Sequence, residues 1–198
     1  MSTMRATTKI RGSRPYLFHN FGRDSIPLGR EAKTGKAGND PDEWRKTVCV
    51  TTDGRLFIKS SQIFATLRDG AKFTRKSRGN VQKDVIAVLT VDTPEEIVLD
   101  RRLPERLTED KREPVYLDIR GVRNPSTGAA NVRYRVALSP GWELEFALLW
   151  DDTIINESTM HAVLIDAGRM CGLGNGRNIG MGRFEVLAFE AVTLKAKA

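Results

Sequence analysis

The sequence predicts an α+β fold of the ferredoxin-like, RRM-like type, with an antiparallel sheet and helices on one face. The order of its patterns supports this: strand, insertion, helix, several strands, helix, glycine-rich loop and strand. Residues 142–150 place a large apolar side chain at every second position, with Glu143 and Glu145 on the other face, as a half-buried strand does. Residues 157–170 instead repeat their apolar side chains at helical spacing.

Length and composition favour one globular domain. We expect a single domain over residues 1–198 with inserted loops near 22–45 and 92–114. No apolar run approaches the ~18 residues of a membrane span, and residues 1–14 lack the apolar centre of a signal peptide. We therefore expect a cytoplasmic protein without a membrane partner. With only Cys49 and Cys171, a disulfide scaffold and a cysteine-rich zinc site are both excluded.

The first forty residues are predicted to contain two strands and a long loop. Residues 4–10 and 16–21 have the composition of strands. Residues 22–42 are polar and have hardly any periodic apolar position. Because loops of this length are usually functional or disordered, this one is a candidate for contact with a partner.

A hairpin and a helix are predicted next. Asp53-Gly54 is a strong turn signal between the strand candidates 47–51 and 55–59. Ser60 and Ser61 then offer an N-cap. The helix behind them should end near Lys72, and its apolar side chains share one face: Ile63, Phe64, Leu67 and Ala71.

The remaining segments are predicted to be mostly strands. Residues 115–122 and 131–138 should pair through a turn at 124–128. A helix over 157–170 precedes the glycine-rich stretch. The other strand candidates are 85–91, 97–99, 142–150 and 183–194.

Basic residues gather in two clusters. The net charge of +7 favours a polyanionic partner. Residues 92–113, by contrast, mix both signs and indicate a solvated surface. The charge pattern predicts nucleic-acid contacts at the two clusters, which are Arg5, Lys9, Arg11 and Arg14, and Lys72, Arg75, Lys76 and Arg78.

Residues 172–182, GLGNGRNIGMG, hold five glycines in eleven positions. Their place between a helix and a strand excludes a Rossmann loop, and no Gly-Lys-Ser/Thr follows to make a Walker A motif. A helix cap and a tight turn would need only one or two glycines. Such a loop suits positive φ angles or close approach to its backbone, and its N–H groups can form an anion-binding concavity. We therefore expect this loop to contact a polyanion through Gly174, Arg177, Gly180 and Arg183.

Two motifs resemble the RAMP superfamily, the RNA-binding proteins of CRISPR systems. The stretch 172–182 resembles the superfamily's C-terminal glycine-rich loop, including a basic residue among the central five. Residues 56–68, LFIKSSQIFATLR, resemble its strand, small-residue turn and helix, with Lys59 where a glycine is common. The resemblance implies that guide RNA contacts Ser60, Ser61, Arg68 and Lys72. Independently of it, hydroxyls at a helix N-terminus suit a phosphate.

The resemblance implies a function that would not need enzymatic activity of its own, with metal-independent or backbone-subunit ribonuclease activity left open. Within the superfamily, the sequence is most similar to a type III-style effector backbone subunit, several copies of which coat one guide RNA. The implied partners are guide RNA, a target strand, further copies of the chain and other effector subunits. Two alternatives remain open: a guide-RNA-processing endoribonuclease, and a nucleic-acid-binding protein of a mobile element with no CRISPR role.

Few residues suggest catalysis. The resemblance implies that His19 could be a general acid or base of a processing nuclease, and that Asp24 could be a cleavage residue of a backbone subunit. His161 is expected at a helix surface. Two histidines without acidic companions at ligand spacing predict no metal site. We therefore assign no catalytic residue, metal or cofactor.

Overall fold

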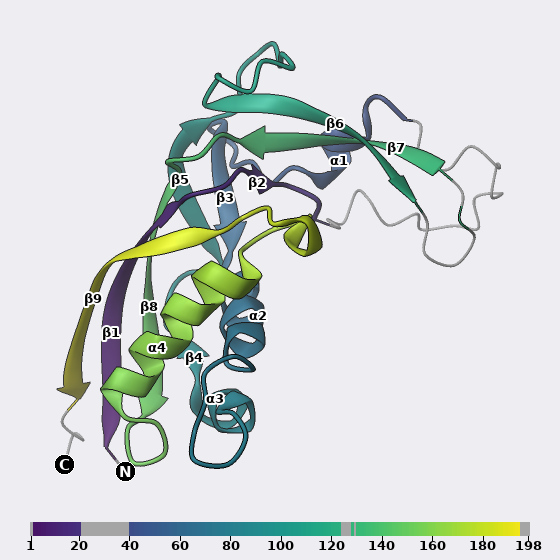
Figure 1. Ribbon diagram of the computed structural model, residues 1–198. Helices are drawn as coiled ribbons and strands as arrows, with labels where there is room; N and C mark the ends of the chain where they lie inside the picture. The colour runs from purple at the N-terminus through teal and green to yellow at the C-terminus, as the bar shows by residue number, and fades with distance from the viewer. Residues whose placement is uncertain (1, 21–39, 124–127, 129, 195–198) are drawn as a thin grey trace, which may run out of the picture.

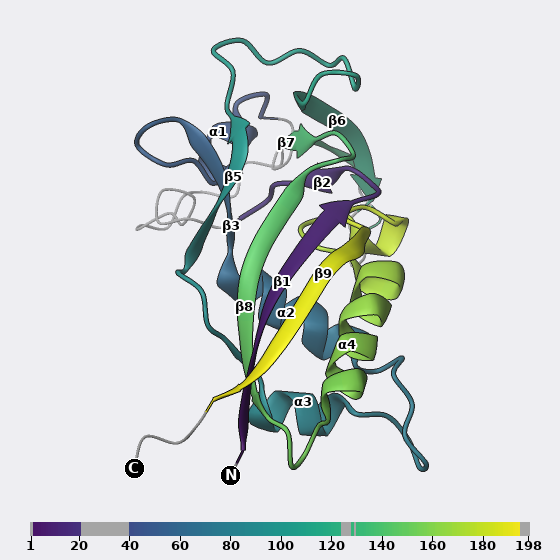
Figure 2. The same ribbon diagram turned by 90° about the vertical axis from the view of Figure 1, so that its left-hand side faces the viewer.

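The computed structural model describes residues 2–20, 40–123, 128 and 130–194. The predicted α+β, ferredoxin-like architecture is confirmed: an antiparallel sheet of order β4-β8-β1-β9 carries its helices on one face (Figures 1 and 2). Its strands are β1 (Thr3–Gly12), β4 (Thr90–Val91), β8 (Glu143–Asp151) and β9 (Phe184–Leu194). The helices against it are α2 (Ser60–Gly70), α3 (Gln82–Val88) and α4 (Glu157–Asp166).

The core lies between this sheet and its helices. Every second residue of β1 is buried, and β8 buries the alternate residues that the sequence predicted. Removing a large apolar side chain from water stabilises the fold by about 1.5–3 kcal/mol. The buried side chains of this layer include Trp142, Leu144, Phe146, Leu148 and Trp150 from the β8 segment, and Met160, Val163, Leu164 and Ala167 from the α4 segment.

Strand β1 lies in the middle of the sheet, and both of its neighbours come from the last third of the chain. Met4 faces Trp150 of β8 on one side and Thr193 of β9 on the other. The first strand of the chain therefore obtains both of its hydrogen-bonded ladders from late segments.

Two smaller sheets accompany the main sheet: one of three strands lies beyond one of its ends, and one of two strands lies beside β8 (Figures 1 and 2). Strand β6 (Val115–Arg123) pairs with β7 (Ala130–Leu138), as predicted, and β2 (Tyr16–Leu17) lies on the other edge of β7. Of the described residues 16–20 in the predicted strand 16–21, only these two are strand. Strand β3 (Arg55–Lys59) pairs with β5 (Glu96–Arg102).

The expected strand at 85–91 is wrong. Helix α3 occupies most of it, and only Thr90–Val91 is strand. Val81, Val85 and Leu89 are all buried, and their spacing of four places them on one helical face. The side chain of Ile86 points away and is 48% exposed. Burial at helical spacing therefore outweighed the preference of β-branched residues for strands.

The region around the predicted hairpin also differs from expectation. Gly54 takes the turn with φ +83°, but residues 47–51 form only a single bridge, between Val50 and Leu56. The short helix α1 (Glu43–Thr47) ends where the first arm should begin. The regular partner of β3 is instead β5, within the segment 92–113 that was expected to be solvated surface.

The expected N-cap at Ser60 and Ser61 is also wrong. Helix α2 begins at Ser60, its N-cap is Lys59, and no side chain caps it. The backbone N–H of Ser60 donates instead to the carbonyl oxygen of Glu95 at 2.9 Å. None of the described helices combines the length and the apolar character needed to cross a membrane.

Candidate nucleic-acid interface

The glycine-rich loop 172–182 follows α4 and a π-helical turn, Ala167–Cys171, and leads into β9. All five glycines have φ between +69° and +82°, where residues with a side chain are strained. Three of them, Gly172, Gly174 and Gly182, are also closely packed. A Cβ at Gly182 would lie 1.8 Å from the carbonyl oxygen of Leu173, and one at Gly174 would lie 2.6 Å from the Tyr16 ring. Gly180 differs, because a Cβ there would meet nothing within 4 Å.

Backbone hydrogen bonds tie this loop to the segment around β2. The N–H of Asn175 donates to the Leu17 carbonyl at 3.0 Å, and that of Gly182 donates to the Pro15 carbonyl at 2.7 Å. Within the described residues, four other N–H groups of the loop have no hydrogen-bond acceptor and are available to a ligand: those of Gly174, Gly176, Arg177 and Asn178.

Three of the sequence-predicted cations converge on one carboxylate, that of Asp69. Arg177 approaches it at 3.2 Å, Arg68 at 3.1 Å and Lys72 at 3.5 Å. Burial acts to raise the pKa of Asp69, but the three cations outweigh burial and hold that pKa below its ordinary value. The carboxylate therefore stays ionised, and the Asp69 cluster (Arg68, Asp69, Lys72 and Arg177) keeps an excess of positive charge.

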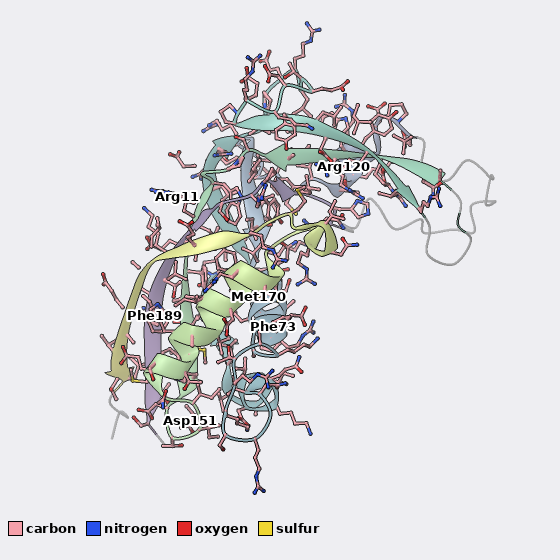
Figure 3. The ribbon with its side chains drawn as sticks, in the orientation of Figure 1. Arg11, Phe73, Arg120, Asp151, Met170 and Phe189 are labelled. Atoms are coloured by element: carbon pink, nitrogen blue, oxygen red, sulfur yellow. The ribbon has the colours of Figure 1, made fainter. Side chains whose placement is uncertain are left out.

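A cavity of about 540 Å³ opens beside the Asp69 cluster. It is lined by Lys72, Arg177 and Asn178 and by two exposed apolar side chains, Phe73 and Met170, which are 50% and 48% exposed. Figure 3 shows these two beside each other on the helical side of the molecule. Cations beside an exposed aromatic ring suit a nucleotide, because phosphates bind cations and bases stack on rings.

A second cavity, of about 650 Å³, lies on the other side of the loop, against β6 and β7. We call it the arginine groove, after Arg120, Arg123, Arg133 and Arg135 in its lining. A smaller cavity of about 120 Å³, lined in part by His19, lies between the two. Because Asn175 lines all three, the glycine-rich loop is bordered by cationic cavities on both sides.

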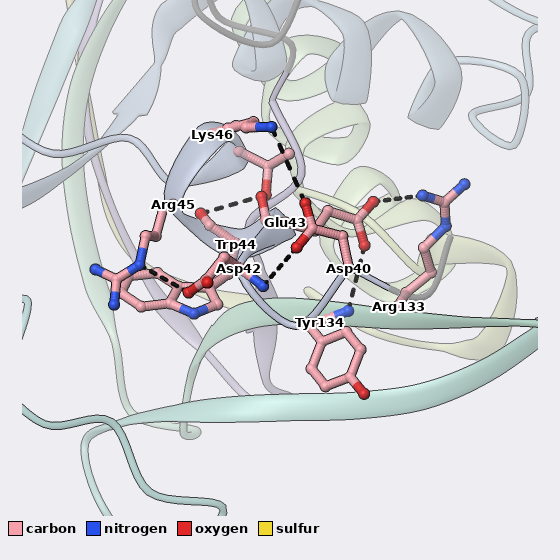
Figure 4. Close-up of polar contacts among 9 residues, drawn as sticks. Asp40, Asp42, Glu43, Trp44, Arg45, Lys46, Arg133 and Tyr134 are labelled. Carbon is pink, nitrogen blue, oxygen red and sulfur yellow. Dashed lines mark hydrogen bonds and ion pairs between the residues drawn. The ribbon is translucent and has the colours of Figure 1, made fainter. Parts of the chain in front are cut away.

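The paired strands β6 and β7 set the positions of the arginines. Arg120 lies opposite Arg133, and Asp118 lies opposite Arg135. The buried Asp118 accepts hydrogen bonds from Arg120 Nε at 2.7 and 2.9 Å. Arg133 forms an ion pair with Glu43 of α1, which also accepts from a backbone N–H of β7 (Figure 4).

His19 lies in the arginine groove, where burial first and then the charge of Arg135 lower its pKa. Its imidazole is therefore neutral at pH 7. Sequence reasoning singled out this histidine but missed the arginines around it. The sequence did offer a signal for them. Arg133 and Arg135 are two residues apart in a predicted strand and therefore share one of its faces, and Arg120 belongs to the strand predicted to pair with it.

Several other residues that the sequence predicted to bind nucleic acid lie away from the glycine-rich loop. Arg11 lies on the open face of the main sheet, where Glu143 binds it at 2.6 Å and also binds Lys9 at 2.8 Å (Figure 3). Arg5 on the same face is paired with Asp92. These three cations are thus each paired with a carboxylate, and Lys9 and Arg11 share the same one.

The remaining predicted residues occupy three places. Arg75, Lys76 and Arg78 lie in the exposed connection between α2 and α3, where Lys76 is paired with Asp84 at 2.6 Å. Ser60 and Ser61 form the first turn of α2. Arg14 and Arg183 share a backbone hydrogen bond of 3.2 Å at the start of β9, and Asp24 lies outside the described residues.

The described residues contain no group of three or more His, Cys, Asp or Glu side chains that could hold a metal ion. Both cysteines, Cys49 and Cys171, are buried free thiols, and burial raises the pKa of each.

Neither the family models nor the curated proteins compared with this sequence give a match. Among solved structures, the chain is similar to a chain of the Type III-B Cmr-beta complex, determined by cryo-electron microscopy with cognate target RNA bound. The TM-score is 0.51 and the identity 8%, over 96% of this chain and 61% of that one. This chain thus spans about three fifths of that protein's length, and at this identity the likeness shows a shared fold.

Proposed function

We propose that this chain is an RNA-binding protein of the RAMP type, a single-domain backbone subunit that coats guide RNA in a CRISPR effector. The observation that carries the proposal is the convergence of cationic cavities on both sides of the glycine-rich loop. The sequence motifs that resemble the superfamily meet at this place. The fold shared with a chain of an RNA-bound Cmr complex supports the same assignment.

Binding along the loop would be independent of base sequence. Phosphates would contact Arg68, Lys72 and Arg177 and the available N–H groups, because these donors recognise backbone oxygens. Phe73 offers a stacking surface for a base of any type. A subunit that coats a guide must tolerate every guide sequence, and this combination permits it.

The test is the stoichiometry on a ~40-nucleotide RNA, because site sizes of ~4–16 nucleotides imply several copies. Analytical ultracentrifugation should show a large particle with RNA and a small species without it. One protein per RNA at saturation would exclude the backbone role. The double variant Lys72→Ala/Arg177→Ala should weaken binding, whereas the matched control Arg5→Ala/Lys9→Ala, on the open sheet face, should not.

The position of His19 favours a second candidate, a guide-RNA-processing endoribonuclease. A neutral imidazole beside Arg135 can accept a proton from a 2′-hydroxyl while the cation stabilises the phosphate. Incubation with a repeat RNA in the absence of metal tests this directly. Cleavage by the parent that is lost in His19→Ala would replace the backbone proposal with the nuclease.

A further inference from the structure

Arg135 of β7 is a buried cation whose side chain forms no hydrogen bond or ion pair with any other described residue. The residue is 6% exposed, and its Nε is buried without a hydrogen-bond acceptor in this part of the chain. Its side chain lines the arginine groove. Burying a charged group is costly unless it is paired and hydrogen-bonded, so a position of this kind calls for a counter-ion.

The nearby carboxylates are already engaged by other groups. Asp118, directly opposite Arg135 in the strand pair, accepts from Arg120 through both of its oxygens. Glu43 accepts from Arg133 and from the backbone N–H of Tyr134. Burial lowers the pKa of Arg135 more than the charges of Asp118 and Glu43 raise it, although a guanidinium remains protonated at neutral pH.

The surroundings are those of an anion site. Arg120 and Arg133 flank Arg135 on the same strand pair, and the glycine-rich loop forms the opposite wall with Gly176 and Asn178. Both of these loop residues have N–H groups without an acceptor among the described residues. A tetrahedral anion accepts several hydrogen bonds at once, which suits a guanidinium fork facing backbone donors.

We propose that Arg135 is the centre of a phosphate-binding site in the arginine groove, occupied by one phosphate group of a bound RNA backbone. The assignment rests on the proposed RNA-binding function for the source of the phosphate. Free phosphate has the same chemistry, so the two sources are tested separately.

The first measurement is thermal unfolding of the full chain in sodium phosphate and in sodium chloride of equal ionic strength. Phosphate should raise the Tm of the parent in a saturable manner and leave that of Arg135→Met unchanged. In chloride, Arg135→Met should melt above the parent, because an unpaired buried charge has been replaced by an apolar side chain of similar length. Arg112→Met is the matched control, since it removes the same charge from a side chain that is 90% exposed and lies outside the groove.

The second measurement is affinity for oligouridine of ~20 nucleotides across a salt series. Arg135→Met should bind at least tenfold more weakly, and the slope of log K against log[salt] should become shallower by about 0.7, the value for one phosphate contact on a single strand. Arg112→Met should bind like the parent.

The outcomes separate this site from the proposed function. If Arg135→Met binds RNA like the parent and phosphate raises its Tm equally, the site is overturned while RNA binding stands. If the parent does not bind RNA but Arg135→Met loses the phosphate effect, the proposed function fails and the site stands. If Arg135→Met does not fold, Arg135→Lys is measured instead: a folded protein without the phosphate effect supports the site, and an unchanged effect overturns it, because an ammonium cannot reproduce the guanidinium fork.

Discussion

Alanine substitutions at Gly180 and Gly174 distinguish a binding role of the glycine-rich loop from a structural one. Both residues have positive φ, of +82° and +76°. Only Gly174 is packed, against the Tyr16 ring at 2.6 Å and the Leu17 carbonyl at 2.8 Å. The same substitution therefore adds strain alone at Gly180, and strain plus steric overlap at Gly174.

The expected losses of stability follow from this difference. A side chain in the left-handed region costs about 1–2 kcal/mol. At Gly174 the overlap adds about 1–3 kcal/mol, so the total is about 2–5 kcal/mol. With about 2–4 °C per kcal/mol for a chain of this size, Gly180→Ala should lower the Tm by about 2–8 °C. Gly174→Ala should lower it by about 4–20 °C.

RNA affinity, measured well below the Tm of each variant, gives the second readout. If RNA lies against the backbone at Gly180, the added methyl group should weaken binding at least tenfold although the fold is only mildly destabilised. Calorimetry and fluorescence anisotropy on the same preparations supply both numbers. Binding by Gly180→Ala that equals the parent's would refute this reasoning and leave the loop with a structural role only.

Three further predictions concern the basic connection, the Asp69 cluster and the core. Changing Arg75 and Lys76 together to alanine should flatten the slope of log K against log[salt] by about 1.4, two contacts at about 0.7 each, and an unchanged slope removes them from the interface. Because the pKa of Asp69 is lowered in the fold, its ion pairs stabilise the protein above the unfolded-state pKa of about 3.9 and lose that contribution as pH falls through the folded value. The free energy of unfolding of Asp69→Asn should thus fall less on acidification than that of the parent. Equal pH profiles of the two proteins would contradict this. Gly12→Ala should be strongly destabilised in denaturant titrations, since its Cβ would lie 2.0 Å from the Trp142 ring, and a parent-like midpoint would contradict the packing described.

The elements that the sequence predicted well are those whose pattern has one explanation. The large apolar side chains at every second position of 142–150 correspond to the buried face of β8, and the spacing of Met160, Val163 and Leu164 corresponds to the buried face of α4. Residues 85–91 have two explanations, because β-branched side chains favour a strand while Val81, Val85 and Leu89 fit a helix. Whether this segment forms a strand or a helix depends on which other residues pack against it, and those residues lie elsewhere in the chain.

The candidate site was predicted only where its residues belong to a local motif. Arg68, Lys72 and Arg177 came from the two motifs, but Asp69, which holds them together, carries no signal of its own. Arg135 has the sequence context of an ordinary strand arginine, and its burial results from β6, α1 and the glycine-rich loop meeting around it. The spacing of Arg133 and Arg135 indicates that they share one face of a strand, but it does not indicate that Arg135 is buried there.

The central position of β1 has a consequence for how the chain folds. Its first strand cannot pair until β8 and β9 are available, so the main sheet must form by joining the most distant parts of the sequence. Non-local pairing of this kind slows folding, because loop entropy is lost before the contacts that compensate for it are made. During synthesis β1 would expose two unpaired edges for as long as the ribosome needs to complete β9, and such edges invite aggregation. Lower temperature or added chaperones should therefore raise the recombinant yield of folded protein more than the stability of the finished fold would suggest.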